Sequence, residues 1–467
     1  MSFVLEEYLN SFTNWEARLG QAQQADFGLE RVEKLLGAFG RPDDRVRFVH
    51  VAGSKGKGST CAFLAHILRA AGYRVGLYTS PHLNDVRERI RVLEPRGAEV
   101  APAAGHDPFE GMISVEEMIE RVRFYQEPVD RLRNDEGVPV TYFEYLTALA
   151  VSYFAARKVD VAVLETGLGG RLDATSAVDA MVCGITPLGL EHTAILGNTL
   201  EQIAAEKAGI IRAPSQKVVC APQPEAAMAV IRARCRSFGI TPTVVGRDMA
   251  LSVRSQGVDG VTFDVTGRRE YRGLVTQLAG EHQALNAAVA LAMVEDLEMF
   301  GFMLTEEAAA QGIRETVWPA RFEVLGERPR FVLDCAHTRE SAAAFAATFR
   351  TVFPGRKAVL IFGASSDKDL AALAGELVSV AGQVVLARAS HPRACDLTVS
   401  DGERLFPGVS VCRANSAGEA VEMATRLVGT DGLVAVTGSV FLCAEARRTI
   451  TGSAPGADEV EEAHVPV

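Results

Sequence analysis

Short apolar runs of strand length alternate with longer segments of helical spacing along most of the chain. Continuous apolar runs of this kind are typical of strands in a parallel sheet that helices cover on both faces. The first series of predicted strands comprises Arg47–Val51, Arg74–Tyr78, Asp160–Leu164 and Met181–Thr186. The pattern therefore predicts an α/β fold built on a parallel sheet.

Helical signals fill the segments around these strands. Thr60–Ala71 stops at Gly72, and glycine commonly follows a helix C-terminus. The other predicted helices are Val115–Leu132, Tyr142–Ala156, 199–208, 224–238 and 281–299, and residues 1–45 are also expected to be helical with a break at Gly40-Arg41-Pro42. Polar and apolar residues alternate between 242 and 278, which predicts a small antiparallel β patch.

A second series of strands and helices begins after Trp318-Pro319. Its predicted strands are Phe331–Leu333, Ala358–Phe362, Val384–Ala387 and Leu433–Val436. We place a domain boundary around 305–320, which gives a first domain of residues 1–305 and a smaller Rossmann-like domain of residues 306–452. The glycine- and proline-rich stretch 94–112 is predicted to be a surface loop, and the acidic tail 453–467 is predicted to be disordered.

Composition limits the function classes. The chain has 467 residues, 48% of them apolar, which suits two or three globular domains. A net charge of −11 disfavours a nucleic-acid partner. The chain has no evident signal peptide and no apolar run of the roughly 18 residues that span a membrane. The 8 cysteines form no C-x-x-C pair and are typical of a reducing compartment, so we expect a cytoplasmic protein.

A glycine-rich loop, Gly53–Gly58, lies between a predicted strand and a predicted helix, as a phosphate loop requires. Backbone amides at a helix N-terminus attract phosphate oxygens. Lys57 can reach a terminal phosphate, and Ser59 can hold Mg²⁺. The strict G-x-x-x-x-G-K-[ST] spacing is not met, because position 51 is valine and Gly58 separates the lysine from the serine. A flexible glycine turn is the alternative.

Three more polar residues, Ser80, Glu165 and His192, lie just past the carboxyl ends of predicted strands. Ligands of open α/β sheets bind at that edge, and Mg²⁺ sites commonly combine one or two carboxylates with substrate phosphates. Each residue also has a plain interpretation, as a turn serine, a solvated strand end or a loop histidine. Their joint occurrence beside the glycine-rich loop favours a site for ATP and Mg²⁺.

Other polar residues lie at helix ends and at the domain joint. They are Lys207, Gln283, Asn286, Arg321, Asp334 and His337. Taken alone, Lys207, Gln283 and Asn286 are expected to be helix-surface side chains, and Arg321 with Asp334 an ordinary salt bridge. At a domain joint, however, an arginine and an aspartate can reach across to a nucleotide.

The ordered set of motifs resembles the folylpolyglutamate synthase/dihydrofolate synthase family of the Mur ligase superfamily. The motifs are FGLERV (27–32), VAGSKGKGST (51–60), GLYTSPHL (76–83), RERIRV (87–92), TYFEYLT (141–147), LETGLGGRLDAT (164–175), EHTAILG (191–197), EKAGIIR (206–212), GEHQALNAAVA (280–290), PARFEV (319–324), DCAH (334–337), DKDL (367–370) and HPRA (391–394). The resemblance implies a P-loop, Mur-ligase-type ATPase domain followed by a Rossmann-like ligase domain. It also implies an ATP-dependent ligase that adds L-glutamate to dihydropteroate or reduced folates through an acyl phosphate, and we expect a monomer.

The resemblance further implies roles for single residues. Phosphates and nucleotide would be held by Gly56, Lys57, Gly58, Ser59, Asn286, Arg321 and Asp334. One Mg²⁺ would bind Ser59, and a second would bind Ser80, Glu165 and His192. Lys207 resembles a lysine that the family carbamylates, and His337 matches a histidine near the phosphates, so Lys57, His192, Lys207 and His337 are the candidate catalytic residues. The pterin pocket would comprise Asp26, Phe27, Gly28, Thr141 and Leu172.

Two stretches depart from the family pattern. Ser54-Lys55 stand where Thr-Asn is usual, and Cys335 replaces a usual glycine, with Thr338-Arg339 in place of Asn-Pro. The FGLERV and TYFEYLT stretches favour a pocket that takes dihydropteroate, hence a bifunctional enzyme. The alternatives are a folylpolyglutamate synthase alone, another Mur-type amino-acid ligase, a non-catalytic nucleotide-binding protein and a transporter ATPase.

Overall fold

The computed structural model describes residues 5–18, 22–23, 26–96 and 107–452. Its first sheet has seven strands in the order β3-β2-β4-β1-β5-β6-β7, all parallel except that β3 runs antiparallel to β2. The strands are β1 (Phe48–Ala52), β2 (Val75–Tyr78), β3 (Ile90–Leu93), β4 (Val161–Glu165), β5 (Ala180–Ile185), β6 (Lys217–Cys220) and β7 (Thr243–Val244).

Helices cover both faces of this sheet, as the apolar strands predict. Neighbouring residues of β1 point to opposite faces: Phe48 packs in a core with Tyr145 and Leu149, whereas Val49 packs in a second core with Phe63. The helices are α1 (Leu5–Asn10), α2 (Glu30–Ala38), α3 (Lys57–Ala70), α4 (Val115–Asn134), α5 (Tyr142–Ala156), α6 (Thr193–Leu196), α7 (Leu200–Lys207), α8 (Glu225–Ser237), α9 (Glu281–Leu297) and α10 (Glu306–Glu315). Short 3₁₀ turns are η3 (Pro42–Arg45), η4 (Val86–Arg89), η5 (Ala174–Ala177), η6 (Ala208–Ile210) and η7 (Glu298–Phe300).

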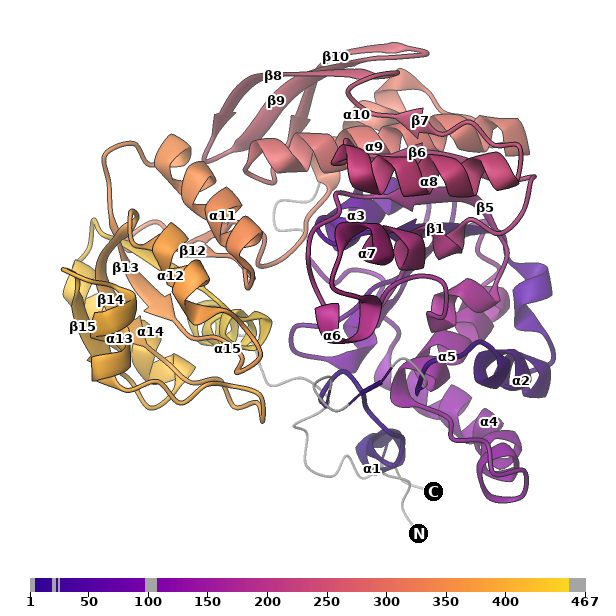
Figure 1. Cartoon of the computed structure of the whole chain (residues 1–467), viewed down its shortest axis with the longest axis horizontal. Coiled ribbons are helices and arrows are strands. Elements are labelled where there is room, and N and C mark those ends of the chain that lie inside the picture. Colours follow the sequence, from indigo (N-terminus) through magenta and orange to yellow (C-terminus); the bar gives the residue numbers. More distant parts are fainter. Residues whose placement is uncertain (1–4, 19–21, 24–25, 97–106, 453–467) are drawn as a thin grey trace.

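The alternating segment forms an antiparallel sheet, which confirms the predicted β patch. Its strands are β8 (Ala250–Gly257), β9 (Gly260–Thr266) and β10 (Glu270–Thr276), with β9 in the middle. Phe263 of β9 belongs to the same apolar core as α3 and α9. In Figure 1 this sheet lies above α9, at the top of the view.

The second half carries a six-stranded sheet in the order β11-β12-β16-β13-β14-β15, in which only the β11–β12 pair is antiparallel. The strands are β11 (Glu323–Leu325), β12 (Arg330–Leu333), β13 (Ala358–Phe362), β14 (Ala381–Leu386), β15 (Ser410–Arg413) and β16 (Leu433–Thr437). The helices are α11 (Arg339–Val352), α12 (Leu370–Leu377), α13 (Val399–Leu405), α14 (Ala417–Val428) and α15 (Val440–Thr451). Figure 1 shows this half, in orange and yellow, beside the first half.

One sequence expectation needs correction, and two others lie outside the described residues. Residues 1–45 are not largely helical, because turns and loops separate α1, α2 and η3 in the part that is described. The predicted surface loop lies mostly in 97–106 and the predicted disordered tail in 453–467, both outside the described residues. Among the described helices, none is both long and apolar enough to cross a bilayer.

Helix α10 packs on the first half of the molecule. A Cβ atom placed on Gly312 would lie 2.4 Å from Cα of Ile67 on α3, so glycine permits this close approach. The chain then reaches β11 of the second sheet through residues 316–322. We propose that the domain boundary follows α10 rather than preceding it at residue 305.

Candidate active site

A cavity of about 430 Å³ lies between the two halves. The strand register explains one wall, because Val51 of β1 lies opposite Glu165 of β4, and Ala52 lies opposite Ile185 of β5. The carboxyl ends of these strands therefore meet at one edge of the sheet, and the loops that follow them face the cavity. The other wall comes from the second half, including Asp334 and His337.

The glycine-rich loop lies on the first wall. Gly56 has φ +82° and precedes the first residue of α3, and a Cβ atom there would lie 2.2 Å from Oδ1 of Asn286. Lys57 Nζ donates a hydrogen bond to the Gly53 carbonyl at 3.1 Å. Gly58 and Ser59 also line the cavity. The loop thus directs the amides at the α3 N-terminus and an ammonium group toward the same space, a combination that suits phosphate.

A buried carboxylate lies beside the loop. Glu165 is 5% exposed and accepts a hydrogen bond from the Ser80 backbone N–H at 3.2 Å. Burial raises the pKa of Glu165, and the nearby Lys57 charge opposes that rise. His192 also lines the cavity, and burial lowers its pKa to about 4, so its imidazole is neutral near pH 7. Ser80, Glu165 and His192 therefore reach the same cavity from the ends of three strands.

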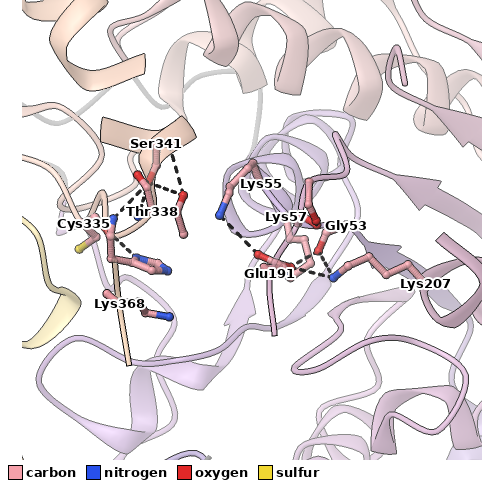
Figure 2. A network of polar contacts seen from close by, with 12 residues as sticks. Gly53, Lys55, Lys57, Glu191, Lys207, Cys335, Thr338, Ser341 and Lys368 are labelled. Atoms are coloured by element: carbon pink, nitrogen blue, oxygen red, sulfur yellow. Dashed lines mark hydrogen bonds and ion pairs between the residues drawn. The ribbon is translucent and has the colours of Figure 1, made fainter. Parts of the chain in front are cut away.

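Lysines converge on Glu191, which was not among the predicted site residues. Lys207 Nζ lies 2.9 Å from Glu191 Oε1, and Lys55 Nζ lies 3.4 Å from Oε2 (Figure 2). Burial opposes ionisation of Glu191, but the charges of Lys207, Lys57 and Lys55 outweigh it and hold its pKa well below the usual range. The one signal in the sequence was its position next to His192 in the EHTAILG motif.

Lys207 is not the exposed helix-surface lysine that the sequence alone predicts. Its side chain is buried, with the whole residue 1% exposed, and Nζ also donates to the Gly53 carbonyl at 2.7 Å. Burial lowers its pKa to about 8, although Glu191 acts in the opposite direction. Lys207 does not line the cavity itself, but it connects the glycine-rich loop to Glu191 directly behind the wall.

On the opposite wall, backbone amides orient Asp334. Its carboxylate accepts hydrogen bonds from the N–H groups of Phe322 at 2.8 Å and Ala336 at 2.9 Å. Burial raises the pKa of Asp334 to about 6, and the charge of Arg321 limits the rise. Arg321 also lines the cavity. This pair thus faces the phosphate loop from the second half.

His337 follows on the same loop. Its Nδ1 lies 2.8 Å from the Cys335 carbonyl, which assigns the proton to Nδ1 and leaves a lone pair on Nε2. Burial lowers the pKa of His337 to about 3. Lys368, which stood out in the sequence only as part of the DKDL motif, lines the cavity as well (Figure 2).

Asn286 and Gln283 are buried on α9 rather than exposed on its surface. Asn286 Nδ2 donates to Gln283 Oε1 at 3.0 Å, and both residues line the cavity. The amide pair therefore lies directly against the glycine-rich loop, where Gly56 leaves room for it.

The predicted pterin pocket is brought together only in part. Phe27, Thr141 and Leu172 line the cavity, whereas Asp26 and Gly28 do not. The Asp26 carboxylate instead accepts a hydrogen bond from the Gln23 backbone N–H at 2.7 Å. Two aromatic residues of the same recess, Trp15 and Phe143, were not predicted from the sequence. No spacing pattern links Trp15 to the others, because the fold alone brings them together.

The donor set fits Mg²⁺ carried by a nucleotide. The described residues contain no group of three or more His, Cys, Asp or Glu side chains arranged for a metal. The buried Glu165 carboxylate nevertheless lies with the Ser59 and Ser80 hydroxyls and the neutral His192 around one cavity. Mg²⁺ prefers oxygen ligands and usually keeps several positions for phosphates and water. One carboxylate with hydroxyl groups meets that preference.

Comparison with known proteins places both halves in one class. Residues 122–294 match the Mur ligase middle domain, and residues 320–440 match the Mur ligase, glutamate ligase domain. The chain is thus built from the domains of a Mur-type ligase. It is 32% identical to a Bacillus subtilis protein named dihydrofolate synthase/folylpolyglutamate synthase, over 91% of this chain and 95% of that one. With this similarity along nearly its whole length, the chain belongs to the folylpolyglutamate synthase/dihydrofolate synthase family.

Two further relatives extend the comparison. The chain is 38% identical to a Haloferax volcanii protein named probable bifunctional folylpolyglutamate synthase/dihydropteroate synthase, over 91% of this chain. The match spans about half of that relative, 48% of its length. The crystal structure of Mycobacterium tuberculosis folylpolyglutamate synthase complexed with ADP and AMPPCP superimposes with a TM-score of 0.81 at 31% identity, over 92% of this chain and 96% of that one. The α/β fold expected from the sequence is thereby confirmed.

Proposed function

We propose that this chain is an ATP-dependent ligase that adds L-glutamate to dihydropteroate and to reduced folates through an acyl phosphate. One observation carries the proposal: a single cavity joins a phosphate loop and a buried carboxylate to an Arg–Asp–His group of the other half, beside an aromatic recess. The name of the Bacillus relative, which covers both activities, supports it. The Mycobacterium enzyme was crystallised as a complex with ADP and AMPPCP, which supports ATP as the nucleotide.

In this proposal the two walls divide the binding of ATP. Lys57 and the backbone amides of residues 56–59 bind the phosphates, and Asn286, Arg321 and Asp334 contact the nucleotide from the opposite side. Ser59 would hold one Mg²⁺, and Ser80, Glu165 and His192 would hold a second. When bound, these ions neutralise phosphate charge and favour phosphoryl transfer.

The chemistry then has two steps. A carboxylate oxygen of the acceptor attacks the γ-phosphorus of ATP, which forms an acyl phosphate and releases ADP. The amine of L-glutamate attacks the acyl carbon, a C–N bond forms, and inorganic phosphate leaves with the electrons of the C–O bond. Because an acyl phosphate hydrolyses readily, the reaction needs a cleft that excludes water. The position of the cavity between two halves suits that need.

His337 has an orienting role in this scheme. His337 lines the cavity, and its Nδ1–H is held by the Cys335 carbonyl, which leaves Nε2 as the acceptor. A pKa of about 3 makes it a weak base near neutral pH. It is therefore suited to accept a hydrogen bond from the glutamate amine and direct its attack rather than to keep the proton.

Lys207 is the proposed carbamylation site. Only a neutral amine reacts with CO₂, and the lowered pKa of about 8 leaves an appreciable share of Lys207 neutral at physiological pH. Carbamylation would turn the cation beside Glu191 into an anion. Lys55 and Lys57, which also act on Glu191, would then stabilise both negative groups.

The aromatic recess supports a flat heterocyclic acceptor. Trp15, Phe27 and Phe143 offer ring faces, and Leu172 adds apolar surface. The Haloferax relative carries a dihydropteroate synthase in its name. An enzyme of that name supplies dihydropteroate, so its fusion to a chain similar to this one supports dihydropteroate as an acceptor. We also propose a cytoplasmic monomer, and the eight unpaired cysteines agree with a reducing compartment.

Phosphate release from Mg²⁺–ATP tests the proposal when it is measured in parallel with dihydropteroate and with tetrahydrofolate. We expect release with either acceptor and a strict requirement for L-glutamate. Release with one acceptor alone would reduce the proposal to a single activity. Release that needs a different amino acid, or no folate, would point to another Mur-type ligase.

A further inference from the structure

Two cysteines of the second half lie close together at the cavity wall. Cys335 follows β12 in the loop that also carries Asp334 and His337, and Cys443 lies on α15. The Cys443 thiol donates to the Asp334 carbonyl at 3.2 Å. That carbonyl is bonded directly to the backbone nitrogen of Cys335, and both cysteines belong to one apolar core. Neither is paired in a disulfide.

The two thiols differ in access. Cys335 is 4% exposed, yet it lines the cavity, so a small molecule that enters the cleft can reach it. Cys443 is 0% exposed and is not among the residues that line the cavity. A reagent from solution therefore meets Cys335 first, and Cys443 is positioned to react only with Cys335.

The surroundings of Cys335 also favour its thiolate. The neighbouring Cys443 thiol and the charge of Arg321 lower the pKa of Cys335, although burial and Asp334 oppose this. By contrast, burial raises the pKa of every other cysteine: Cys61, Cys183, Cys220, Cys235, Cys395, Cys412 and Cys443. A thiolate beside a guanidinium is the form that reacts with peroxides.

We propose that Cys335 is a peroxide-sensitive thiol at the nucleotide site and that Cys443 resolves its oxidised form. The Cys335 thiolate attacks one oxygen of hydrogen peroxide, the O–O bond breaks, and hydroxide leaves, so Cys335 becomes a sulfenic acid. The Cys443 thiol then attacks the Cys335 sulfur, its proton and the hydroxyl group leave as water, and a disulfide forms. The peroxide is reduced by two electrons, and the two thiols are oxidised by two.

The disulfide has a consequence for nucleotide binding. It removes the Cys335 thiolate, which the charge of Arg321 favours, and ties the Asp334 loop to α15. Asp334 and Arg321 are the residues that face the phosphate loop from this half. We therefore expect oxidation to weaken binding of an ATP analogue by about tenfold or more, as the loss of hydrogen bonds to charged groups does. Bound nucleotide fills the cavity, so it should slow the oxidation.

Disulfide mapping tests the proposal without any assay of ligase activity. The full-length protein is treated with a small excess of hydrogen peroxide, its remaining thiols are alkylated, and peptides are analysed by mass spectrometry without reduction. We expect a linked pair of peptides that contain Cys335 and Cys443, reversal by dithiothreitol, and slower formation in the presence of AMPPCP. Oxidation that begins at the more exposed Cys395 or Cys412, with Cys335 unmodified, would overturn the proposal.

Two variants sharpen the test. Cys443→Ser keeps a hydrogen-bond donor to the Asp334 carbonyl, and we expect it to bind AMPPCP normally before oxidation. After peroxide it should retain a sulfenic acid at Cys335, detectable with a dimedone-type reagent. Cys412→Ser removes a thiol far along the chain on β15 and should form the disulfide as the parent protein does. If Cys443→Ser does not fold, the peptide map of the parent protein still decides the outcome.

Discussion

At the scale of single residues, the site depends on a buried network of opposite charges around Glu191. Removal of one partner from such a network leaves an uncompensated charge, which typically costs about 3 kcal/mol or more. The same network holds Lys207 against the glycine-rich loop through the Gly53 carbonyl. Charge balance and the position of the loop are therefore coupled at this point.

The variant Lys207→Met tests how far stability and activity depend on this lysine. We expect it to lower the free energy of unfolding of the uncarbamylated protein by about 3 kcal/mol, because Glu191 loses its partner at 2.9 Å, and to abolish phosphate release, because the proposed carbamate can no longer form. Urea unfolding and the phosphate assay measure the two effects. The double variant Lys207→Met/Glu191→Gln should regain most of the stability without the activity. If the double variant recovered both stability and phosphate release, Lys207 would serve only to balance the charge of Glu191.

Asp334 provides a pH prediction. Its pKa of about 6 means that the carboxylate gains a proton as the pH falls through 6, and the neutral form loses its charge interaction with Arg321. We expect kcat/KM for ATP to fall as pH is lowered from 7 to 5, since this parameter reports groups of the free enzyme. Asp334→Asn should have low activity without this inflection. If Asp334→Asn kept the same inflection in its pH profile, the inflection would belong to another titrating group.

The residues that sequence reasoning could place are those next to strand ends. Ser80, Glu165 and His192 share no local pattern, but parallel strands bring their carboxyl ends together, so their meeting could be foreseen. Trp15, Phe143 and Glu191 could not be selected, because their role at the cavity depends on distant segments. Asp26 lies next to Phe27 in the chain, yet its carboxylate turns to the backbone of Gln23 instead.

At the scale of elements, the apolar strands were predictable and the short or polar ones were not. Every position of β1, β4 and β13 is buried, so each appears as a largely apolar run, with His50 in β1 and Glu165 at the end of β4 as the exceptions. By contrast, β15 has no fully buried position and β7 has two residues, and neither left a distinct signal. The register of the first sheet then fixes where the phosphate loop and Glu165 lie relative to each other.

Substitution of Gly56 tests whether the loop between β1 and α3 binds the nucleotide. An alanine there would adopt a positive φ, which costs roughly 1–2 kcal/mol, and its Cβ would lie 2.2 Å from Oδ1 of Asn286. We therefore expect Gly56→Ala to lose both stability and AMPPCP binding, measured by thermal unfolding and calorimetry.

Gly72 provides the matched control for that junction. Gly72 ends α3 with φ +92° and has no atom within 4 Å of an added Cβ, so Gly72→Ala carries the backbone strain without the clash. It should lose stability and keep nucleotide binding. Equal binding by the two alanine variants would contradict the proposed role of the loop.

At the scale of the whole molecule, the site is complete only where the two halves meet. Arg393 of the second half donates to the Glu16 carbonyl of the first half at 2.9 Å and pairs with Asp367 at 3.0 Å. The Glu16 carboxylate is in turn held by the buried Arg89. No sequence pattern predicts such a contact, because it joins segments 377 positions apart.

Arg393→Ala should therefore weaken closure of the cleft. We expect kcat to fall about fivefold, as the loss of one partly exposed charge-assisted hydrogen bond suggests, while the affinity for AMPPCP stays nearly constant. Small-angle scattering should show a larger radius of gyration. Arg413, which pairs with Asp396 inside the second half, serves as the control. A loss of AMPPCP affinity equal to the loss of kcat would place Arg393 in nucleotide binding instead.

The most direct measurement is the mass of the product formed from ATP, L-glutamate and dihydropteroate. We expect dihydropteroate to gain one glutamyl residue, with one ADP and one phosphate formed for each amide bond. Lys57→Ala should form no product, because it removes the loop cation proposed to bind the phosphates. Hydrolysis of ATP without a glutamylated product, in an enzyme that also leaves tetrahydrofolate unchanged, would contradict the account.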